Sequence, residues 1–115
     1  MKIIASLLLL TVLLPAATST TGYLPNVDTA VVTSTVALGY MHLNNKSAGT
    51  VTCVVKDRGT NCGGGACPVW GPAPLGASGQ LNSIVSWDFH SMTAASGVQW
   101  SCDTASAIVG WISYY

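Results

Sequence analysis

Residues 80–90 read QLNSIVSWDFH, and the alternation inside this stretch decides the fold class. Apolar and polar side chains alternate from residue 85 onward, with Val85, Trp87 and Phe89 in one set and Ser86, Asp88 and His90 in the other. Successive side chains of a β-strand point to opposite faces of a sheet, so a period of two predicts a strand with one buried face. We expect the apolar set to pack in the core.

Other segments of the chain also have the composition of β-strands. Short runs rich in Val, Thr, Ile, Trp and Tyr are punctuated by Gly and Pro, which is typical of strands. The expected strands cover residues 29–38 with a continuation to 45, then 50–56, 98–102 and 106–115. A helix starting at Asp28 is the alternative for residues 29–38, because Asp28 could cap it. Five or six strands predict an all-β domain, a compact antiparallel β-sandwich or small β-barrel.

Turns and loops are expected between these strands. Asp57-Arg58-Gly59 predicts a tight hairpin turn with a return strand from about Thr60. Residues 63–79 hold many glycines and three prolines, which cannot donate ladder hydrogen bonds, so we expect a long loop there. Long loops in compact domains are often functional.

The N-terminus has the layout of a secretory signal peptide. Lys2 precedes an apolar run from Ile3 to Leu14, and Ala17 and Ser19 offer the small residues that a signal peptidase recognises. The run is shorter than the 20 or so residues that span a membrane. We therefore expect a signal peptide at residues 1–19, with cleavage after Ser19 or else after Ala17, and one secreted β domain at residues 20–115.

Four cysteines are expected to form two disulfides in an oxidising compartment. They are Cys53, Cys62, Cys67 and Cys102. The glycines between Cys62 and Cys67 allow a short closed loop, which would leave Cys53 to pair with Cys102. Pairing of Cys53 with Cys62 and of Cys67 with Cys102 is an open alternative. A zinc site formed by these cysteines is a less favoured alternative, because the secretory context favours disulfides.

Charge is scarce in the expected mature chain. It has three cationic side chains and four Asp carboxylates, and the chain contains no Glu, so the net charge lies near minus one. Nucleic acid and an electrostatically bound membrane are therefore not expected partners. The apolar C-terminal stretch is short for a lipid-anchor signal, and we expect a final strand there instead of a membrane anchor. We expect no cofactor and no metal.

One pair of residues could carry acid–base chemistry. Asp88 and His90 point the same way on the expected strand, and a carboxylate beside an imidazole is what a general base needs. His42, with a Ser or Thr hydroxyl, could complete a hydrolytic set. The competing interpretation is a polar, solvent-facing side of the strand. No Gly-x-Ser-x-Gly motif occurs, so the sequence contains no firm catalytic set.

Aromatic residues outside the core pattern are the candidate binding residues. Trp70 stands in the expected loop, where it could cover the end of the core or expose a ring to a sugar or a protein. Tyr114 and Tyr115 offer a second candidate contact edge at the C-terminus. Asn45-Lys46-Ser47 is an acceptor triplet for N-glycosylation at Asn45, expected in an exposed loop of a secreted protein.

The signal-like start, short domain, four cysteines and Trp-bearing β-rich body together resemble the small secreted cysteine-containing proteins of fungi. The resemblance implies an effector-like or wall-associated role and assigns no functional residue. We therefore expect a secreted, non-enzymatic interaction protein whose partner is an extracellular protein or polysaccharide. The alternatives are a small secreted hydrolase using Asp88, His90 and His42, and a toxin or inhibitor that presents the Cys62–Cys67 loop.

Overall fold

A computed structural model describes residues 18–115 of the chain, with side chains described from Gly22 onward. The expected signal peptide therefore lies outside the described residues, apart from the backbone of Thr18 and Ser19. The described part contains eight strands and one short 3-10 helix. They are β1 (Thr18–Tyr23), β2 (Thr29–Val32), β3 (Val36–Asn45), β4 (Val51–Asp57), β5 (Cys67–Leu75), η1 (Leu81–Ser83), β6 (Ile84–Ala94), β7 (Val98–Cys102) and β8 (Ile108–Tyr114).

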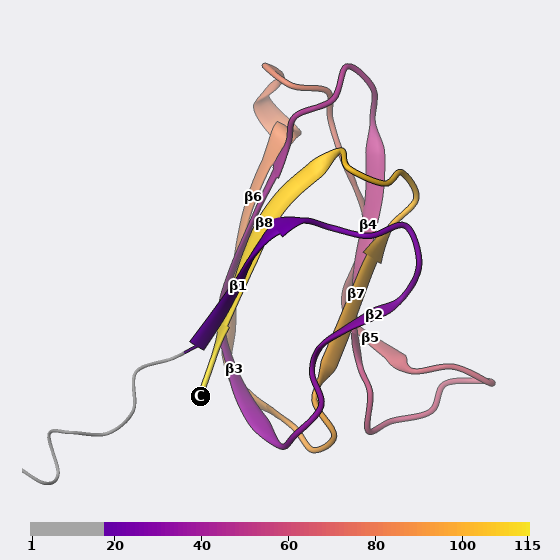
Figure 1. The fold of residues 1–115 in the computed structure, drawn as a ribbon, viewed down its shortest axis with the longest axis vertical. Coiled ribbons are helices and arrows are strands. Elements are labelled where there is room, and N and C mark those ends of the chain that lie inside the picture. Colours follow the sequence, from indigo (N-terminus) through magenta and orange to yellow (C-terminus); the bar gives the residue numbers. More distant parts are fainter. Residues whose placement is uncertain (1–17) are drawn as a thin grey trace, which may run out of the picture.

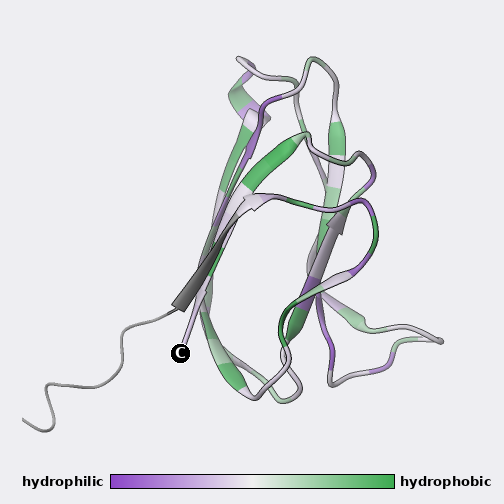
Figure 2. Cartoon of the chain, viewed as in Figure 1, coloured by the Kyte–Doolittle hydropathy of each residue, from purple (hydrophilic) through white to green (hydrophobic). Residues whose placement is uncertain are grey.

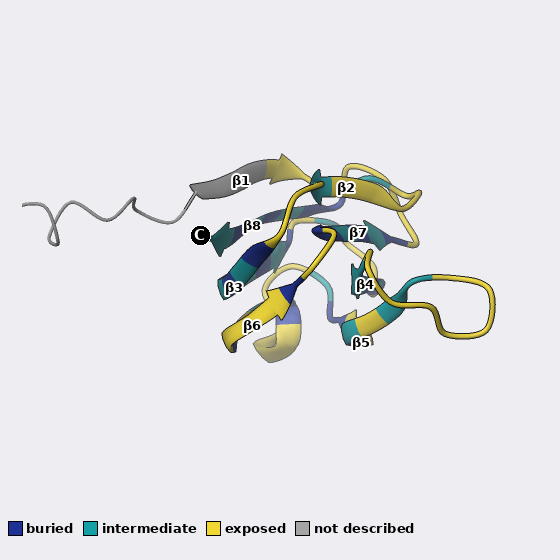
Figure 3. Cartoon of the chain, turned by 90° about the horizontal axis from the view of Figure 1, so that it is seen from below, coloured by how far each residue is buried: buried dark blue, intermediate teal, exposed yellow. Residues whose placement is uncertain are grey.

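The strands form two antiparallel sheets that face each other as a β-sandwich (Figure 1). The first sheet has the order β1-β8-β3-β6, and the second has the order β2-β7-β4-β5. Edges β6 and β5 lie on one side of the sandwich, and edges β1 and β2 lie on the other (Figure 3). The predicted all-β fold is confirmed in its sandwich form. The single strand expected over residues 29–45 is instead two strands, β2 and β3, which are separated at residues 33–35 and belong to different sheets. The alternative helix from Asp28 is also wrong.

The core lies between the sheets and follows the predicted alternation. Along β3, the inward residues Leu38, Met41 and Leu43 are buried, while β8 contributes Ile108 and Ile112. The second sheet supplies Val51, Cys53, Val55, Val98 and Trp100. Hydrophobic residues accordingly gather along the strands, with hydrophilic ones mostly in the turns (Figure 2). No helix in the described residues is long and apolar enough to cross a membrane.

The predicted loop at residues 63–79 is wrong for its central part. Residues 67–75 form β5, which pairs with β4 at the edge of the second sheet. An edge strand tolerates proline because one of its sides needs no ladder hydrogen bonds, and Pro68, Pro72 and Pro74 are all exposed there. Gly71 adopts a φ of +79°, and a Cβ there would lie 2.6 Å from the carbonyl oxygen of Cys53. Glycine lets this proline-rich strand approach β4 closely.

The hairpin between β4 and β5 turns where expected but returns later than expected. The backbone N–H of Gly59 donates to the Asp57 carboxylate at 2.9 Å, which fixes the start of the turn. The return strand begins at Cys67 opposite Asp57, not at Thr60. Residues 58–66 therefore form a loop that projects from the sandwich (Figure 1).

Trp87 does not share the burial of the other core-facing residues. It is 46% exposed although its neighbour across the strands, Met41, is buried. The physical reason is its place on β6, an edge strand with no further strand beside it to cover the ring. Trp100, on the inner strand β7, is by contrast buried.

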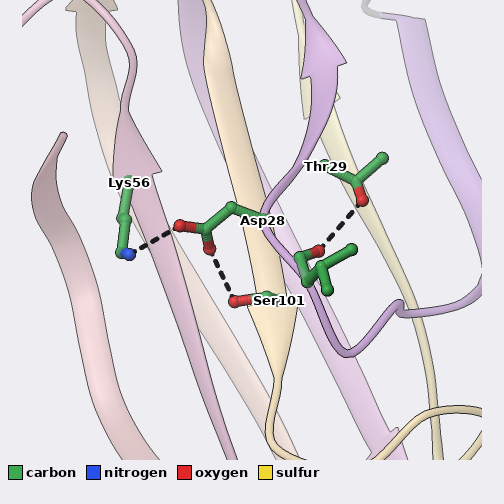
Figure 4. A network of polar contacts seen from close by, with 5 residues as sticks. Asp28, Thr29, Lys56 and Ser101 are labelled. Carbon is green, nitrogen blue, oxygen red and sulfur yellow. Dashed lines mark hydrogen bonds and ion pairs between the residues drawn. The ribbon is translucent and has the colours of Figure 1, made fainter. Parts of the chain in front are cut away.

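A polar network fastens the start of β2 to the outer face of the second sheet (Figure 4). One Asp28 carboxylate oxygen accepts a hydrogen bond from the Lys56 ammonium at 2.7 Å, and the other accepts one from the Ser101 hydroxyl at 2.7 Å. These two contacts, led by Lys56, lower the pKa of Asp28 below its ordinary value of 3.8. β2 is short and irregularly paired, so this network supplies part of its attachment.

We expect the network to make stability depend on pH in the acid range. The folded-state pKa of Asp28 is lower than its unfolded value, so its contribution is full above about pH 4 and is lost as the pH falls through the folded value. Urea melts of the wild type and of Asp28→Asn, taken from neutral pH to about pH 2, should converge on acidification. A constant difference in the free energy of unfolding across that range would contradict this account.

Candidate binding site on the outer face of the first sheet

A bulge in β6 shapes the candidate site. Asp88 pairs with Tyr40 and Met92 pairs with Leu38, so three residues of β6 lie opposite the single residue Gly39. Two of the three, His90 and Ser91, have φ values of 54° and 60°, a left-handed conformation that non-glycine residues rarely adopt. The Asp88 carboxylate supports this bulge by accepting the His90 backbone N–H at 2.7 Å. Strained backbone of this kind is concentrated at functional sites.

The bulge borders a pocket of about 590 Å³ on the outer face of the sheet, which falls in the usual range for small-ligand sites. Strands β3, β6 and β8 and the C-terminal residue line it. The lining residues are Gly39, Tyr40, Asp88, His90, Ser91, Ser113 and Tyr115. Aromatic rings and small polar groups thus meet in one concavity.

The absence of a side chain at Gly39 keeps the pocket open. A Cβ at this position would lie 2.5 Å from the Ser113 hydroxyl oxygen. That oxygen accepts the Tyr40 backbone N–H at 2.8 Å, so Ser113 ties β8 to β3 beneath the tyrosine. The Ser91 hydroxyl bonds the Tyr115 phenol across the other side of the pocket. Both tyrosine rings remain more than half exposed and available to a ligand.

The structure brings together two of the three predicted catalytic residues. His90 Nδ1 lies 3.5 Å from an Asp88 carboxylate oxygen, but the His90 side chain is 85% exposed. His42 is not in the pocket lining. Its Nδ1 instead lies 3.1 Å from the Ser86 hydroxyl, and its ring stacks on Trp111 with centroids 6.1 Å apart. His42 is therefore not part of the pocket that Asp88 and His90 line.

The predicted binding residues fall in three different environments. Trp70 is only 9% exposed and packs in the core from β5, so it covers the core and has no free face for a ligand. Tyr114 is partly buried and also packs against the core. Tyr115 is exposed and lines the pocket. Of the three, Tyr115 alone lies at the candidate site.

Asn45 lies in the interior, not in an exposed loop. Its amide nitrogen donates to the carbonyl oxygens of Gly49, Leu75 and Gly76 at 2.8–3.2 Å. Its carbonyl oxygen accepts from the backbone N–H and the hydroxyl of Ser47. The side chain thereby joins the end of β3 to the end of β5. The expectation that Asn45 lies in an exposed loop is therefore wrong.

The disulfides pair Cys53 with Cys102 and Cys62 with Cys67. The first joins directly opposed residues of β4 and β7 in the interior. The second closes the projecting loop, where Cys62 and the three glycines after it are exposed (Figure 3). The described residues contain no group of three or more His, Cys, Asp or Glu side chains that could hold a metal ion.

Sequence reasoning missed Gly39, Tyr40, Ser91 and Ser113. One signal was visible, because Tyr40, His42 and Asn44 alternate with the buried Met41 and Leu43 along one strand. Comparison with known protein families, with curated proteins and with solved structures finds no match to this chain.

Proposed function

We propose that this chain is a secreted, non-enzymatic binding protein whose pocket on the first sheet holds a sugar residue of an extracellular polysaccharide. The observation that carries the proposal is the convergence of two exposed tyrosine rings with a carboxylate and hydroxyl groups in one open pocket. An aromatic face packs against the C–H face of a pyranose ring, and carboxylate and hydroxyl oxygens bond its hydroxyl groups.

The pocket's preorganisation supports binding. Ser113 fixes the backbone of Tyr40, and Asp88 fixes that of His90. Groups held in place before a ligand arrives lose less conformational freedom on binding. The exposure of His90 and the absence of His42 from the pocket lining favour a binding role over hydrolysis.

The proposed location rests on the signal-like N-terminus and the disulfides. Disulfides form and persist in oxidising, extracellular environments, and the structure has two of them with no free cysteine in its described residues. An effector-like or wall-associated protein is the concrete form that we propose. A wall polysaccharide would be a ligand within its reach.

The test is a binding titration on matched tyrosine variants. Isothermal titration with cellotriose, laminaritriose, chitotriose and mannotriose should identify at least one ligand of the wild type. Tyr40→Ala should weaken that binding by about tenfold or more, because it removes the ring that lines the pocket. Tyr23→Ala is the control, since Tyr23 is 59% exposed on the same sheet against 58% for Tyr40, yet lies outside the pocket.

Two outcomes would contradict the proposal. One is that none of the four trisaccharides binds. The other is that Tyr40→Ala and Tyr23→Ala bind as the wild type does, with thermal melts showing that both variants are folded.

A toxin or inhibitor role for the projecting loop is the second candidate function. It is favoured by the exposure of residues 58–65 and by the Cys62–Cys67 disulfide, which stiffens the loop together with a hydrogen bond from the Cys62 N–H to the Gly65 carbonyl at 2.7 Å. This role predicts inhibition of secreted proteases by the wild type that is lost in the double variant Cys62→Ser and Cys67→Ser. Equal inhibition by both proteins, or none by either, would dismiss it.

A further inference from the structure

We infer that the ligand is an uncharged, linear glycan that occupies two adjacent subsites, the pocket and the stacked pair His42 and Trp111 beside it. This inference rests on the proposed function and adds the chemical class and the direction of the ligand. Three features of the outer face support this inference. They are its charge, the cross-strand row of side chains next to the pocket, and the row after that, where a row is a set of residues that lie opposite one another on β6, β3 and β8.

The charge of the face selects against anionic ligands. The cationic side chains Lys46, Lys56 and Arg58 do not line the pocket, and Lys56 is paired with Asp28 on the second sheet. The pocket itself contributes the carboxylate of Asp88. A sulfated or uronic-acid chain would meet this carboxylate with no Lys or Arg in the pocket lining to balance it, and the one basic side chain of the lining, His90, already lies 3.5 Å from Asp88. A neutral, hydroxyl-rich ligand meets no such repulsion.

The row next to the pocket repeats its chemistry. His42 follows Tyr40 by two residues on β3, so both project from the same face about 6.6 Å apart along the strand. Across the sheet, His42 lies opposite Trp111 of β8 and Ser86 of β6. The rings of His42 and Trp111 are stacked at an interplanar angle of 22°, and Ser86 bonds the imidazole. This row again offers aromatic surface with polar groups attached.

The rows beyond these two do not continue the pattern. The next residue on this face of β3, two positions after His42, is Asn44, and it lies between the apolar residues Ile84 and Val109 of the neighbouring strands. At the other end, the β6 bulge and the Tyr115 backbone, which bonds Ala37 in both directions, border the pocket. The favourable surface therefore spans two rows along β3, which suits consecutive rings of an unbranched chain.

The test compares monosaccharides with trisaccharides on variants of the two rows. Glucose, mannose and N-acetylglucosamine are titrated beside cellotriose, laminaritriose, mannotriose and chitotriose. The wild type should bind its preferred trisaccharide about tenfold more tightly than the matching monosaccharide. Trp111→Ala should remove that difference by lowering the trisaccharide affinity, and His42→Ala should act in the same direction. Tyr40→Ala should weaken both ligands, and Asn44→Ala should weaken neither.

The outcomes separate this inference from the proposed function. If Tyr40→Ala abolishes binding but Trp111→Ala and His42→Ala do not change trisaccharide affinity, the second subsite is wrong and the pocket stands. Tighter binding of trigalacturonate than of every neutral trisaccharide would overturn the uncharged class. If no sugar binds the wild type, the proposed function falls as well. Trp111→Phe should retain most of the trisaccharide affinity, which guards against a folding defect in Trp111→Ala.

Discussion

Removing the Cys53–Cys102 disulfide with a double alanine substitution should lower the free energy of unfolding by about 4 kcal/mol, against about 2 kcal/mol for the same change at Cys62 and Cys67. The crosslinks close loops of very different length, with sequence separations of 49 and 5 residues. A longer closed loop removes more conformational freedom from the unfolded chain. Cys53 and Cys102 are also buried, so their truncation leaves a cavity between the sheets.

Urea melts of the two double variants measure this difference directly. The loop variant is the matched control, because it also loses one disulfide and two sulfur atoms. Equal losses in the two variants would contradict the pairing of Cys53 with Cys102. Peptide mapping without reduction would then be expected to show the hairpin alternative, Cys53 with Cys62.

Asn45→Ala should lower the free energy of unfolding by about 3 kcal/mol or more, because it leaves several polar groups without their hydrogen-bond partner at once. Three backbone carbonyl oxygens lose the amide donor, and Ser47 loses its acceptor, in a region where the Asn45 side chain is fully buried. Asn44→Ala is the control, since the neighbouring amide lies on the outer face and surface changes usually stay within about 0.5 kcal/mol. Denaturant melts of both variants provide the measurement.

We also expect Asn45 to carry no glycan in the folded protein. A glycan on its amide nitrogen would replace a donor used by the ends of β3 and β5. The intact mass of the folded, secreted protein should therefore contain no N-glycan. A glycan found at Asn45 in folded protein, or equal melts for Asn44→Ala and Asn45→Ala, would contradict this role.

The sequence was sufficient to predict most of the strands. Alternation predicted β4, β7 and β8 because a period of two is typical of a strand, and one alternating set along each of them is buried, including Cys53, Trp100 and Ile112. It failed for β5, where the prolines are tolerated only because the strand lies at an edge. Strand order is set by contacts between distant segments, and no local pattern shows it.

The candidate site could be predicted only in part for the same reason. Asp88 and His90 come together because they are two residues apart, and that spacing was visible in the sequence. The separation of His42 from them depends on the pairing of β3 with β6, which sets Tyr40 and not His42 opposite Asp88. The bulge at His90 and Ser91 could not be predicted from the sequence, because no glycine marks the positions with positive φ. Trp87 is half exposed because β6 is an edge strand, whereas the alternation of apolar and polar residues by itself predicted burial.

Amide chemical-shift mapping can show directly whether the outer face of the first sheet is the binding surface. A ¹⁵N-labelled sample is titrated with the best of the four neutral trisaccharides. We expect shifts confined to Gly39, Tyr40, His42 and their neighbours on β6 and β8, including the Trp111 indole N–H. Shifts confined to residues 58–66 of the projecting loop, or no shifts at saturating sugar, would contradict it.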